Sequence, residues 1–219
     1  MITETSVRHF LEQGAKQVRV FCGDEEGMTA LRSQLQAADA AAAARVKYYI
    51  GDVTAPAYLD EAMSGADYVL YAPTIPYAHQ CDEHPAEACT ALLAPVNTVM
   101  QTAIQQKVQK IVVLVPIPET CNLNPATNSV SSLLVALMEK VVIAQARFQG
   151  QDSPTTICCA RLEDDLNPEP RRSTSGRFAP AKNLKLIDYS FTNATNGDLL
   201  IQTADGIERI ACENFDMKR

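Results

Sequence analysis

The densest group of side chains that could bind a metal ion lies just before a predicted helix. His79, Cys81, Asp82, Glu83 and His84 offer imidazole, thiolate and carboxylate groups, the ligands that zinc and iron accept. Their spacing matches no standard metal site, and the two carboxylates also suit the positive end of the helix that follows. We favour the helix-start interpretation, so no metal site is predicted.

Cysteine and tyrosine side chains are the next candidates for chemistry. Cys121 lies in a predicted loop with no histidine base nearby in the sequence, so a nucleophilic role is not favoured. Tyr77 follows a predicted strand and could reach a cleft there, although packing is the simpler interpretation. Cys158 and Cys159 point to opposite faces of a predicted strand and are interpreted as buried thiols. Seven scattered cysteines without a CxxC pair are typical of reduced thiols in a cytoplasm.

A basic segment between residues 167 and 185 is the candidate anion site. It contains three prolines and shows little periodicity, so we predict a long loop. Arg171, Arg172 and Arg177 could bind phosphate groups of a substrate, because guanidinium groups form bidentate contacts with phosphate. The alternative is a solvated loop without a ligand.

Composition limits the class of protein. The chain has 219 residues and a mass of 23.9 kDa, with 47% hydrophobic and 21% charged residues, which predicts one globular domain. Its net charge of −7 disfavours nucleic acid as a partner. No apolar run is long enough for a membrane helix, and the N-terminal residues do not have the pattern of a signal peptide. We therefore expect a cytoplasmic protein.

Strands and helices alternate along most of the chain. Apolar, β-branched runs predict strands at residues 18–22, 46–50, 67–72, 110–115, 155–160 and 198–202. Helical spacing predicts helices at residues 25–38, 56–63, 85–106 and 129–148. This alternation indicates an α/β fold with a doubly wound, mostly parallel sheet that binds ligands at the carboxyl ends of its strands. We expect residues 1–166 to form a Rossmann-like domain, with residues 167–219 as its basic loop and short C-terminal appendage.

Four short motifs occur in a characteristic order. Gly51-Asp52-Val53 and Tyr71-Ala72-Pro73 follow two strands, a run from Asp82 to Ala88 opens the long helix, and Asn124-Pro125 precedes the next helix. This order resembles the extended short-chain dehydrogenase/reductases, and most of all the CapD-type nucleotide-sugar 4,6-dehydratases of polysaccharide biosynthesis. The resemblance covers about residues 7–165. It implies an NAD(P) site to which Asp52 and Ala72 would contribute.

The start of the chain departs from that family. The resemblance implies a first strand and a glycine-rich turn whose N–H groups hold the cofactor pyrophosphate. Here the first residues lead directly into a helix, and no glycine occurs before Gly14. The carboxylate of Glu4 would oppose a diphosphate. We expect the cofactor platform to be missing, so NAD(P) binds only if the ancestral site survives in another form.

The catalytic pair is the second departure. The family uses a Tyr-x-x-x-Lys pair, in which the lysine helps to lower the tyrosine pKa for proton transfer. No such pair occurs in this sequence, and the matching positions, anchored on Glu139-Lys140, fall near Ser131 and Val135. The family's Ser/Thr-Asp-Lys run is replaced by the sequence Val-Pro-Ile-Pro at residues 115–118. No catalytic residue is therefore assigned.

The missing first strand creates a topological problem. In the doubly wound order it would lie between the strands at residues 18–22 and 67–72, and its loss would leave backbone groups unpaired. Residues 1–4 could supply a short strand, the two neighbours could close up, or a partner chain could fill the gap. The first solution is favoured.

Three functions are compatible with these observations. The first is a non-catalytic relative of nucleotide-sugar dehydratases, a pseudoenzyme with a binding, regulatory or assembly role, as a homo-oligomer or beside a related biosynthetic enzyme. The second is an epimerase/dehydratase-like enzyme with a rebuilt site that uses Cys121, Tyr77 or the segment from His79 to His84. The third is an NAD(P) sensor.

Overall fold

The computed structural model describes residues 4–74, 78–116, 130–150, 152–162, 181–203 and 206–210. The helices are α1 (Glu4–Glu12), α2 (Glu25–Ala38), α3 (Ala40–Ala43), α4 (Pro56–Met63), α5 (Ala78–Glu83), α6 (Pro85–Gln105), α7 (Val130–Gln149) and α8 (Ala181–Asn193). The strands are β1 (Val18–Cys22), β2 (Val46–Ile50), β3 (Tyr68–Tyr71), β4 (Lys110–Pro116), β5 (Thr156–Leu162), β6 (Leu199–Thr203) and β7 (Gly206–Ile210).

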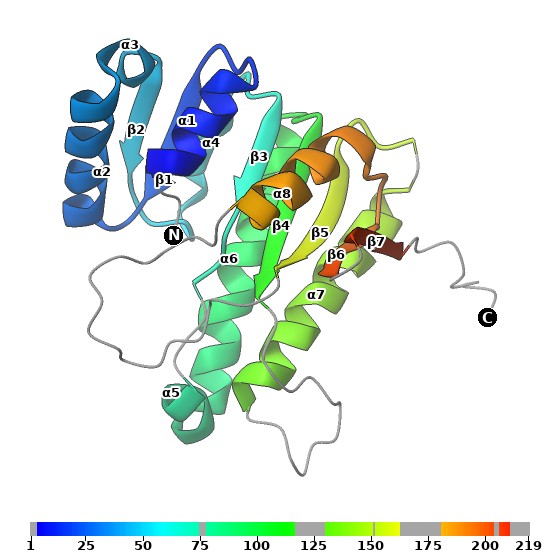
Figure 1. Ribbon diagram of the computed structural model, residues 1–219. Coiled ribbons are helices and arrows are strands. Elements are labelled where there is room, and N and C mark those ends of the chain that lie inside the picture. Colours follow the sequence, from blue (N-terminus) through cyan, green and yellow to red (C-terminus); the bar gives the residue numbers. More distant parts are fainter. Residues whose placement is uncertain are drawn as a thin grey trace.

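The strands form two sheets rather than one. The larger sheet has the order β3-β4-β5-β6-β7, in which only β7 is antiparallel to its neighbour. The smaller sheet consists of the parallel pair β1 and β2. Figure 1 shows both sheets, with the larger one at the centre. The predicted α/β, mostly parallel, Rossmann-like fold is confirmed.

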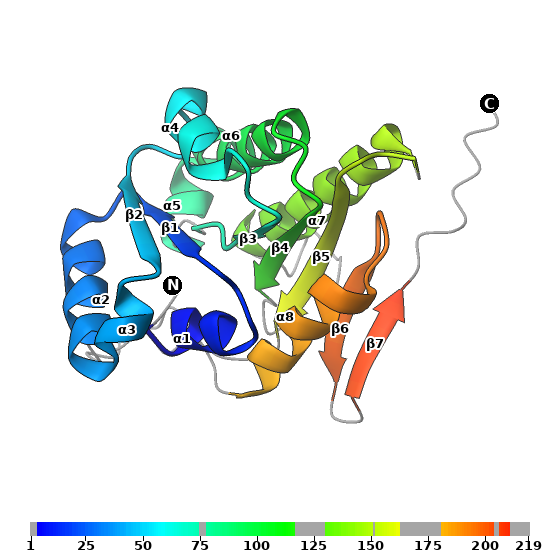
Figure 2. The same ribbon diagram turned by 90° about the horizontal axis from the view of Figure 1, so that it is seen from above.

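Helices cover both faces of the larger sheet. Figure 2 shows α4, α6 and α7 on one face and α1 and α8 on the other. Successive side chains of one strand pack against different helices. Val113 of β4 belongs to the apolar cluster of α6 and α7, whereas Leu114 belongs to the cluster that includes α8. Cys159 and Cys158 divide between these clusters in the same way, as the sequence predicted. A strand that is apolar on both faces is typical of a parallel sheet covered on both sides.

The segment after residue 180 corrects the sequence-based prediction. Lys182 and Lys185, assigned to the basic loop, belong to α8, and the appendage contains two strands, β6 and β7, instead of one. Apolar and polar residues alternate along much of α8, so its sequence does not show the spacing typical of an amphipathic helix. In the structure Leu186 and Ile187 are fully buried against β4 and β5. The remainder of the predicted loop lies outside the described residues.

The N-terminus also differs from the favoured prediction. Glu4 begins α1, so it does not belong to a short strand, and residues 1–3 lie outside the described residues. The second solution is also wrong, because β1 and β3 have not closed up into one sheet. Instead, α1 packs Val7 and Leu11 against β1 and β2, and its His9 pairs with Asp188 of α8.

No described helix is both long and apolar enough to cross a membrane.

Candidate functional site

The carboxyl ends of β1 and β2 are closed by turns that leave little space. Asp24 caps α2 by accepting a hydrogen bond from the Gly27 N–H at 3.0 Å. The N–H of Gly51 donates to the Cys22 carbonyl at 3.3 Å, which holds the two strand ends together. A Cβ atom at Gly51 would lie 3.0 Å from Cγ of Tyr58, a tight contact that would oblige the neighbouring side chain to shift by a few tenths of an ångström.

Asp52, a predicted cofactor residue, lies two residues after the end of β2 and is a turn residue. Its Oδ1 accepts a hydrogen bond from the Thr54 N–H at 2.8 Å, and its carbonyl accepts one from the Ala55 N–H at 3.0 Å. Hydrogen bonding by Thr54 lowers the pKa of the Asp52 carboxyl, because it favours the charged form. The side chain shapes the turn before α4.

Ala72, the second predicted cofactor residue, directly follows β3. It is partly buried against the cluster that contains Leu186 and Ile187 of α8. The preceding Tyr71 packs against the opposite cluster, and burial raises its pKa to about 12. Asp52 and Ala72 thus follow strands of two different sheets.

Helix α7 contains the positions that the family resemblance assigns to the catalytic pair. Val135 is 5% exposed and belongs to the apolar core, and Ser131 lies one turn earlier, half-buried. One turn further on, Glu139 is buried and paired with Arg161 of β5, whose Nη2 and Nε lie 2.6 and 3.0 Å from Glu139 Oε2. The pair joins α7 to the sheet. The described part of α7 carries no tyrosine or lysine in the family's catalytic arrangement.

The family fold implies a dinucleotide cofactor, and the described residues do not fit one. A pyrophosphate needs convergent backbone N–H groups in a glycine-rich turn before the first helix. Here β1 and β3 are not joined by a common neighbour among the described strands, so the strand that would lead into such a turn is not among them. No reaction step is therefore derived through this group.

Several predicted residues cannot be placed. Tyr77, Cys121, Arg171, Arg172 and Arg177 lie outside the described residues, and so does the side chain of His79. Cys81 lies in α5 and is buried, while Asp82 and Glu83 of the same helix are exposed. Within the described ranges, no three His, Cys, Asp or Glu side chains are grouped as a metal site would require. Asp82 instead accepts a hydrogen bond from the Val130 N–H at 3.0 Å, at the first residue of α7.

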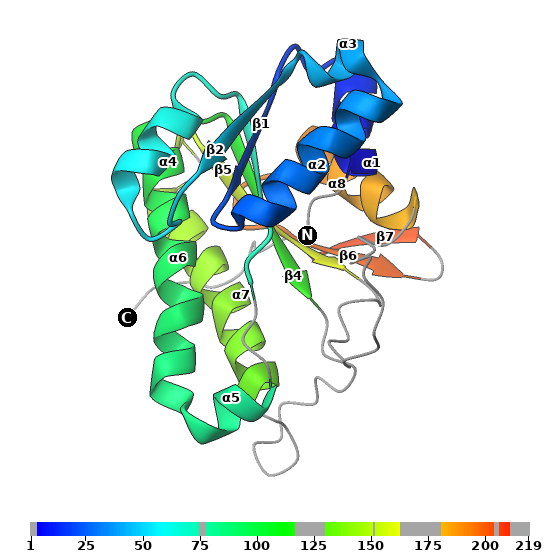
Figure 3. The ribbon, with the colours of Figure 1, turned by 90° about the vertical axis from the view of Figure 1, so that its left-hand side faces the viewer.

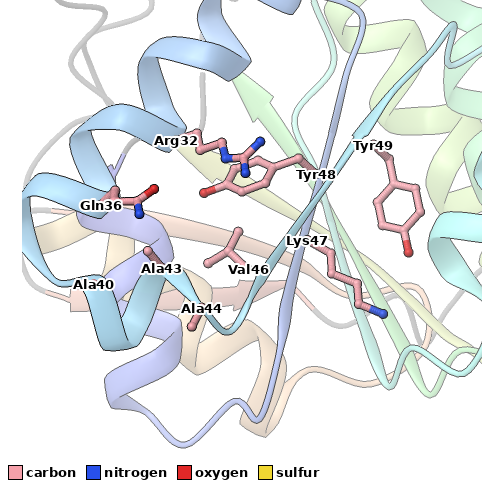
Figure 4. Close-up of a pocket in the computed structure, with 9 residues that line it drawn as sticks. All are labelled: Arg32, Gln36, Ala40, Ala43, Ala44, Val46, Lys47, Tyr48 and Tyr49. Carbon is pink, nitrogen blue, oxygen red and sulfur yellow. The ribbon is translucent and has the colours of Figure 1, made fainter.

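A hollow that the sequence did not indicate lies along the outer edge of β2. Its volume is about 610 Å³, and it is lined by Arg32, Gln36, Ala40, Ala43, Ala44, Val46, Lys47, Tyr48 and Tyr49. The guanidinium of Arg32 lies 5.8 Å from the ring centre of Tyr48, whose buried hydroxyl has no described hydrogen-bond partner. Figure 4 shows Arg32 and Lys47 on opposite sides of β2, so the two cations do not converge on one ligand.

Comparison with known proteins shows the family to which the chain belongs. The family model described as polysaccharide biosynthesis protein matches residues 2–164. A UDP-glucose 4-epimerase of Rickettsia canadensis is 34% identical over 207 residues, and one of Rickettsia felis is 28% identical. Each alignment covers 85% of this chain and 57% of the relative. The chain thus spans little more than half the length of these relatives.

Solved structures support the fold. A short chain dehydrogenase from Bacillus anthracis matches with a TM-score of 0.62 and 12% identity, covering 90% of this chain and 88% of the other. Pen from Bacillus thuringiensis matches with a TM-score of 0.59 and 23% identity, covering 72% and 46%. At such identities the likeness concerns the fold alone.

Proposed function

This chain belongs to the polysaccharide biosynthesis protein family, and from that premise we propose that it has a binding, regulatory or assembly role without the family's hydride-transfer chemistry. The observation that carries the proposal is the absence of a Tyr-x-x-x-Lys pair from the whole sequence, together with the buried Val135 at the lysine position. A lysine there would supply the charge that lowers a tyrosine pKa, and an apolar side chain cannot.

The position of Val135 supports this proposal. Its neighbours in α7, Leu134 and Met138, are buried in the same apolar cluster, so the helix turns a packing surface toward β4 and β5. A charged amine at this position would be desolvated without a described partner, which is costly. The helix stabilises the sheet here, and we assign no proton transfer to it.

Turnover of a nucleotide sugar tests the proposal directly. The purified chain is incubated with UDP-glucose, and separately with UDP-N-acetylglucosamine, each with and without NAD⁺, and the products are followed by NMR. We expect no epimer or 4-keto sugar after prolonged incubation, whereas the Rickettsia canadensis relative serves as the positive control. Sustained formation of either product would overturn the proposal.

An epimerase/dehydratase-like enzyme with a rebuilt site is the second candidate. The specific observation in its favour is the 34% identity to a UDP-glucose 4-epimerase over most of this chain. If this candidate holds, turnover is observed and is lost in Cys121→Ala, in Tyr77→Phe or in a variant of the segment from His79 to His84. A matched control is Cys89→Ala, a half-buried thiol outside that proposed site.

Cofactor binding without chemistry, the sensor function, is tested separately. Native mass spectrometry with and without NAD(P)H reveals any added mass of one dinucleotide per chain. On the proposed function we expect an unchanged spectrum at micromolar cofactor. The same spectra report whether the protein is a homo-oligomer, and a pull-down against a full-length family enzyme tests an assembly role in the cytoplasm.

A further inference from the structure

The hollow beside β2 runs along the edge of this strand and not over one of its faces. It is lined by four consecutive residues, Val46 to Tyr49, together with residues of α2 and α3. Successive side chains of a strand point to opposite faces, so a hollow that meets all four residues follows the edge. Figure 3 views the molecule from this side, with α2 and α4 flanking β2.

The outer edge of β2 carries backbone groups without a partner in the described part of the chain. Among the described strands, β2 pairs only with β1. The Gly51 N–H donates to the Cys22 carbonyl, which fixes the alternation in this parallel pair, because every second residue of β2 turns its backbone groups to β1. The residues between them turn their N–H and C=O groups outward, and these are Val46, Tyr48 and Ile50.

Two cations lie on the two faces of this edge. The Arg32 guanidinium lies 5.8 Å from the ring centre of Tyr48, and Figure 4 shows Lys47 on the other side of β2. Arg32 and Lys47 are exposed, and no ion pair joins either of them to another described residue. The lining of the hollow contains no carboxylate. The edge is therefore a positively charged spot on a chain whose net charge is −7.

This arrangement of charge favours an extended ligand. A compact anion could approach Arg32 or Lys47 but not both, because the two side chains lie on opposite faces of β2. A strand added to the edge points successive side chains to opposite faces, in step with those of β2. Two adjacent acidic residues would then place one carboxylate on each face, each beside one cation. The buried hydroxyl of Tyr48, which has no described hydrogen-bond partner, adds unused bonding capacity on the Arg32 face.

A second copy of β2 fits this edge poorly. Pairing two copies of β2 about a twofold axis would bring two Arg32 side chains to one face and two Lys47 side chains to the other. Like charges across a strand pair destabilise it, and a lysine on an edge strand is a common protection against self-pairing. The same charges favour an acidic partner.

We propose that the outer edge of β2 binds an extended, acidic segment of a different protein, added as an edge strand with two adjacent carboxylates. One carboxylate lies beside Arg32 and Tyr48, and the other lies beside Lys47. Backbone hydrogen bonds supply the affinity and the two carboxylates the specificity. The inference goes beyond the proposed function and does not depend on it, because the hollow is built from α2, α3 and β2, whereas that proposal concerns α7.

A labelled peptide with the sequence Ser-Ile-Thr-Glu-Glu-Val-Ser is the probe. We expect saturable binding by fluorescence anisotropy at concentrations up to about 100 μM. Replacing both glutamates by glutamine should weaken binding about tenfold, since each exposed ion pair contributes a factor of about three. A peptide that contains Glu-Thr-Glu places both carboxylates on one face and should bind about threefold more weakly than the probe. Equal affinities of the three peptides would overturn the proposal.

Protein variants assign each carboxylate to one cation. Arg32→Gln should remove the effect of replacing one glutamate of the peptide, and Lys47→Gln should remove the effect of replacing the other. The pairing that is found reports the direction of the added strand. Lys140→Gln, at an exposed lysine of α7, is the control and should leave binding unchanged. The proposal fails if both glutamates couple to the same cation, or if neither couples to any.

Backbone contacts are tested with N-methylated peptides and hydrogen exchange. Methylating one set of alternate amides should abolish binding, whereas the other set is tolerated, because only one set faces β2. In the complex, exchange at Val46, Tyr48 and Ile50 should slow about tenfold, with no change along β7. Tolerance of both sets of methyl groups, or protection of β7 in place of β2, would contradict strand addition at this edge.

The chain's own acidic residues provide the competing occupant. Glu163, Asp164 and Asp165 follow one another in the sequence and lie outside the described residues. If a second copy used them to occupy the edge, the full chain would associate without any peptide. Sedimentation velocity should show the same mass for the unmodified chain, Arg32→Gln and Lys47→Gln. An oligomer that dissociates in both variants would assign the edge to this chain and overturn the proposed partner.

Discussion

Arg161 of β5 donates two hydrogen bonds to one oxygen of Glu139 in α7, from Nη2 at 2.6 Å and from Nε at 3.0 Å. The Glu139 side chain is 5% exposed, and the Arg161 side chain is 30% exposed. The carboxylate thus lies in the interior, with the guanidinium as its one described ionic partner. The pair holds the helix that carries Ser131 and Val135 against the centre of the larger sheet.

Loss of the arginine should destabilise the fold. Arg161→Met leaves the Glu139 carboxylate buried without its partner, and we expect the free energy of unfolding to fall by about 3 kcal/mol. Urea unfolding followed by circular dichroism measures the change. The control is Glu12→Gln, which removes an exposed ion pair with Arg8 and should cost less than about 0.5 kcal/mol. Equal effects of the two substitutions would contradict this account.

Lys110 stabilises the end of α8. Its Nζ donates to the carbonyl oxygens of Ser190, Phe191 and Ala194 at 3.3, 2.9 and 2.8 Å. Because these carbonyls lie at and just beyond the negative end of the helix, we expect Lys110→Met to cost about 2 kcal/mol. Thermal unfolding measures the loss, and hydrogen exchange should show α8 opening first. Lys47→Met, at an exposed lysine, is the control, and an equal loss there would count against the capping role.

Tyr71 makes stability fall at high pH. Burial raises its pKa to about 12 in the folded protein, whereas an unfolded tyrosine ionises near a pKa of about 10. The folded state keeps the proton longer, so this contribution is complete below about pH 10 and is lost as the pH rises towards 12. Urea unfolding at several pH values in this window should show a shallower decline in Tyr71→Phe. The control is Tyr58→Phe, at a side chain that is 54% exposed, and an unchanged slope in Tyr71→Phe would refute the assignment.

The cysteines should differ sharply in their reaction with iodoacetamide. Cys158 is 1% exposed, and burial raises the pKa of its thiol to about 12, so little thiolate is present at neutral pH. Cys159 is fully buried, whereas Cys22 is partly exposed. Peptide mass mapping of the native protein should find Cys22 alkylated well before the two adjacent thiols. Modification of all three at one rate would mean that β5 is not the central strand described here.

The local pattern of the sequence was sufficient for most elements. The strands at residues 18–22 and 46–50 and the helices at residues 25–38 and 56–63 were predicted to the residue. Each is a short apolar run or an amphipathic repeat bounded by glycine, aspartate or proline, and such signals act over a few residues. Helix α8 was missed because its alternating apolar residues look like a strand, and only packing of Leu186 and Ile187 under the sheet selects the helix.

The properties of the candidate site follow partly from the sequence and partly from the tertiary structure. Sequence by itself determined that Tyr-x-x-x-Lys is absent and that no glycine precedes Gly14, because these are statements about residue types. Only the tertiary structure decided that Asp52 serves a turn, that Val135 is buried in the core and that β1 and β3 remain apart. Strand pairing joins residues far apart in the chain, so whether β1 and β3 pair with each other is decided only when both strands are in place.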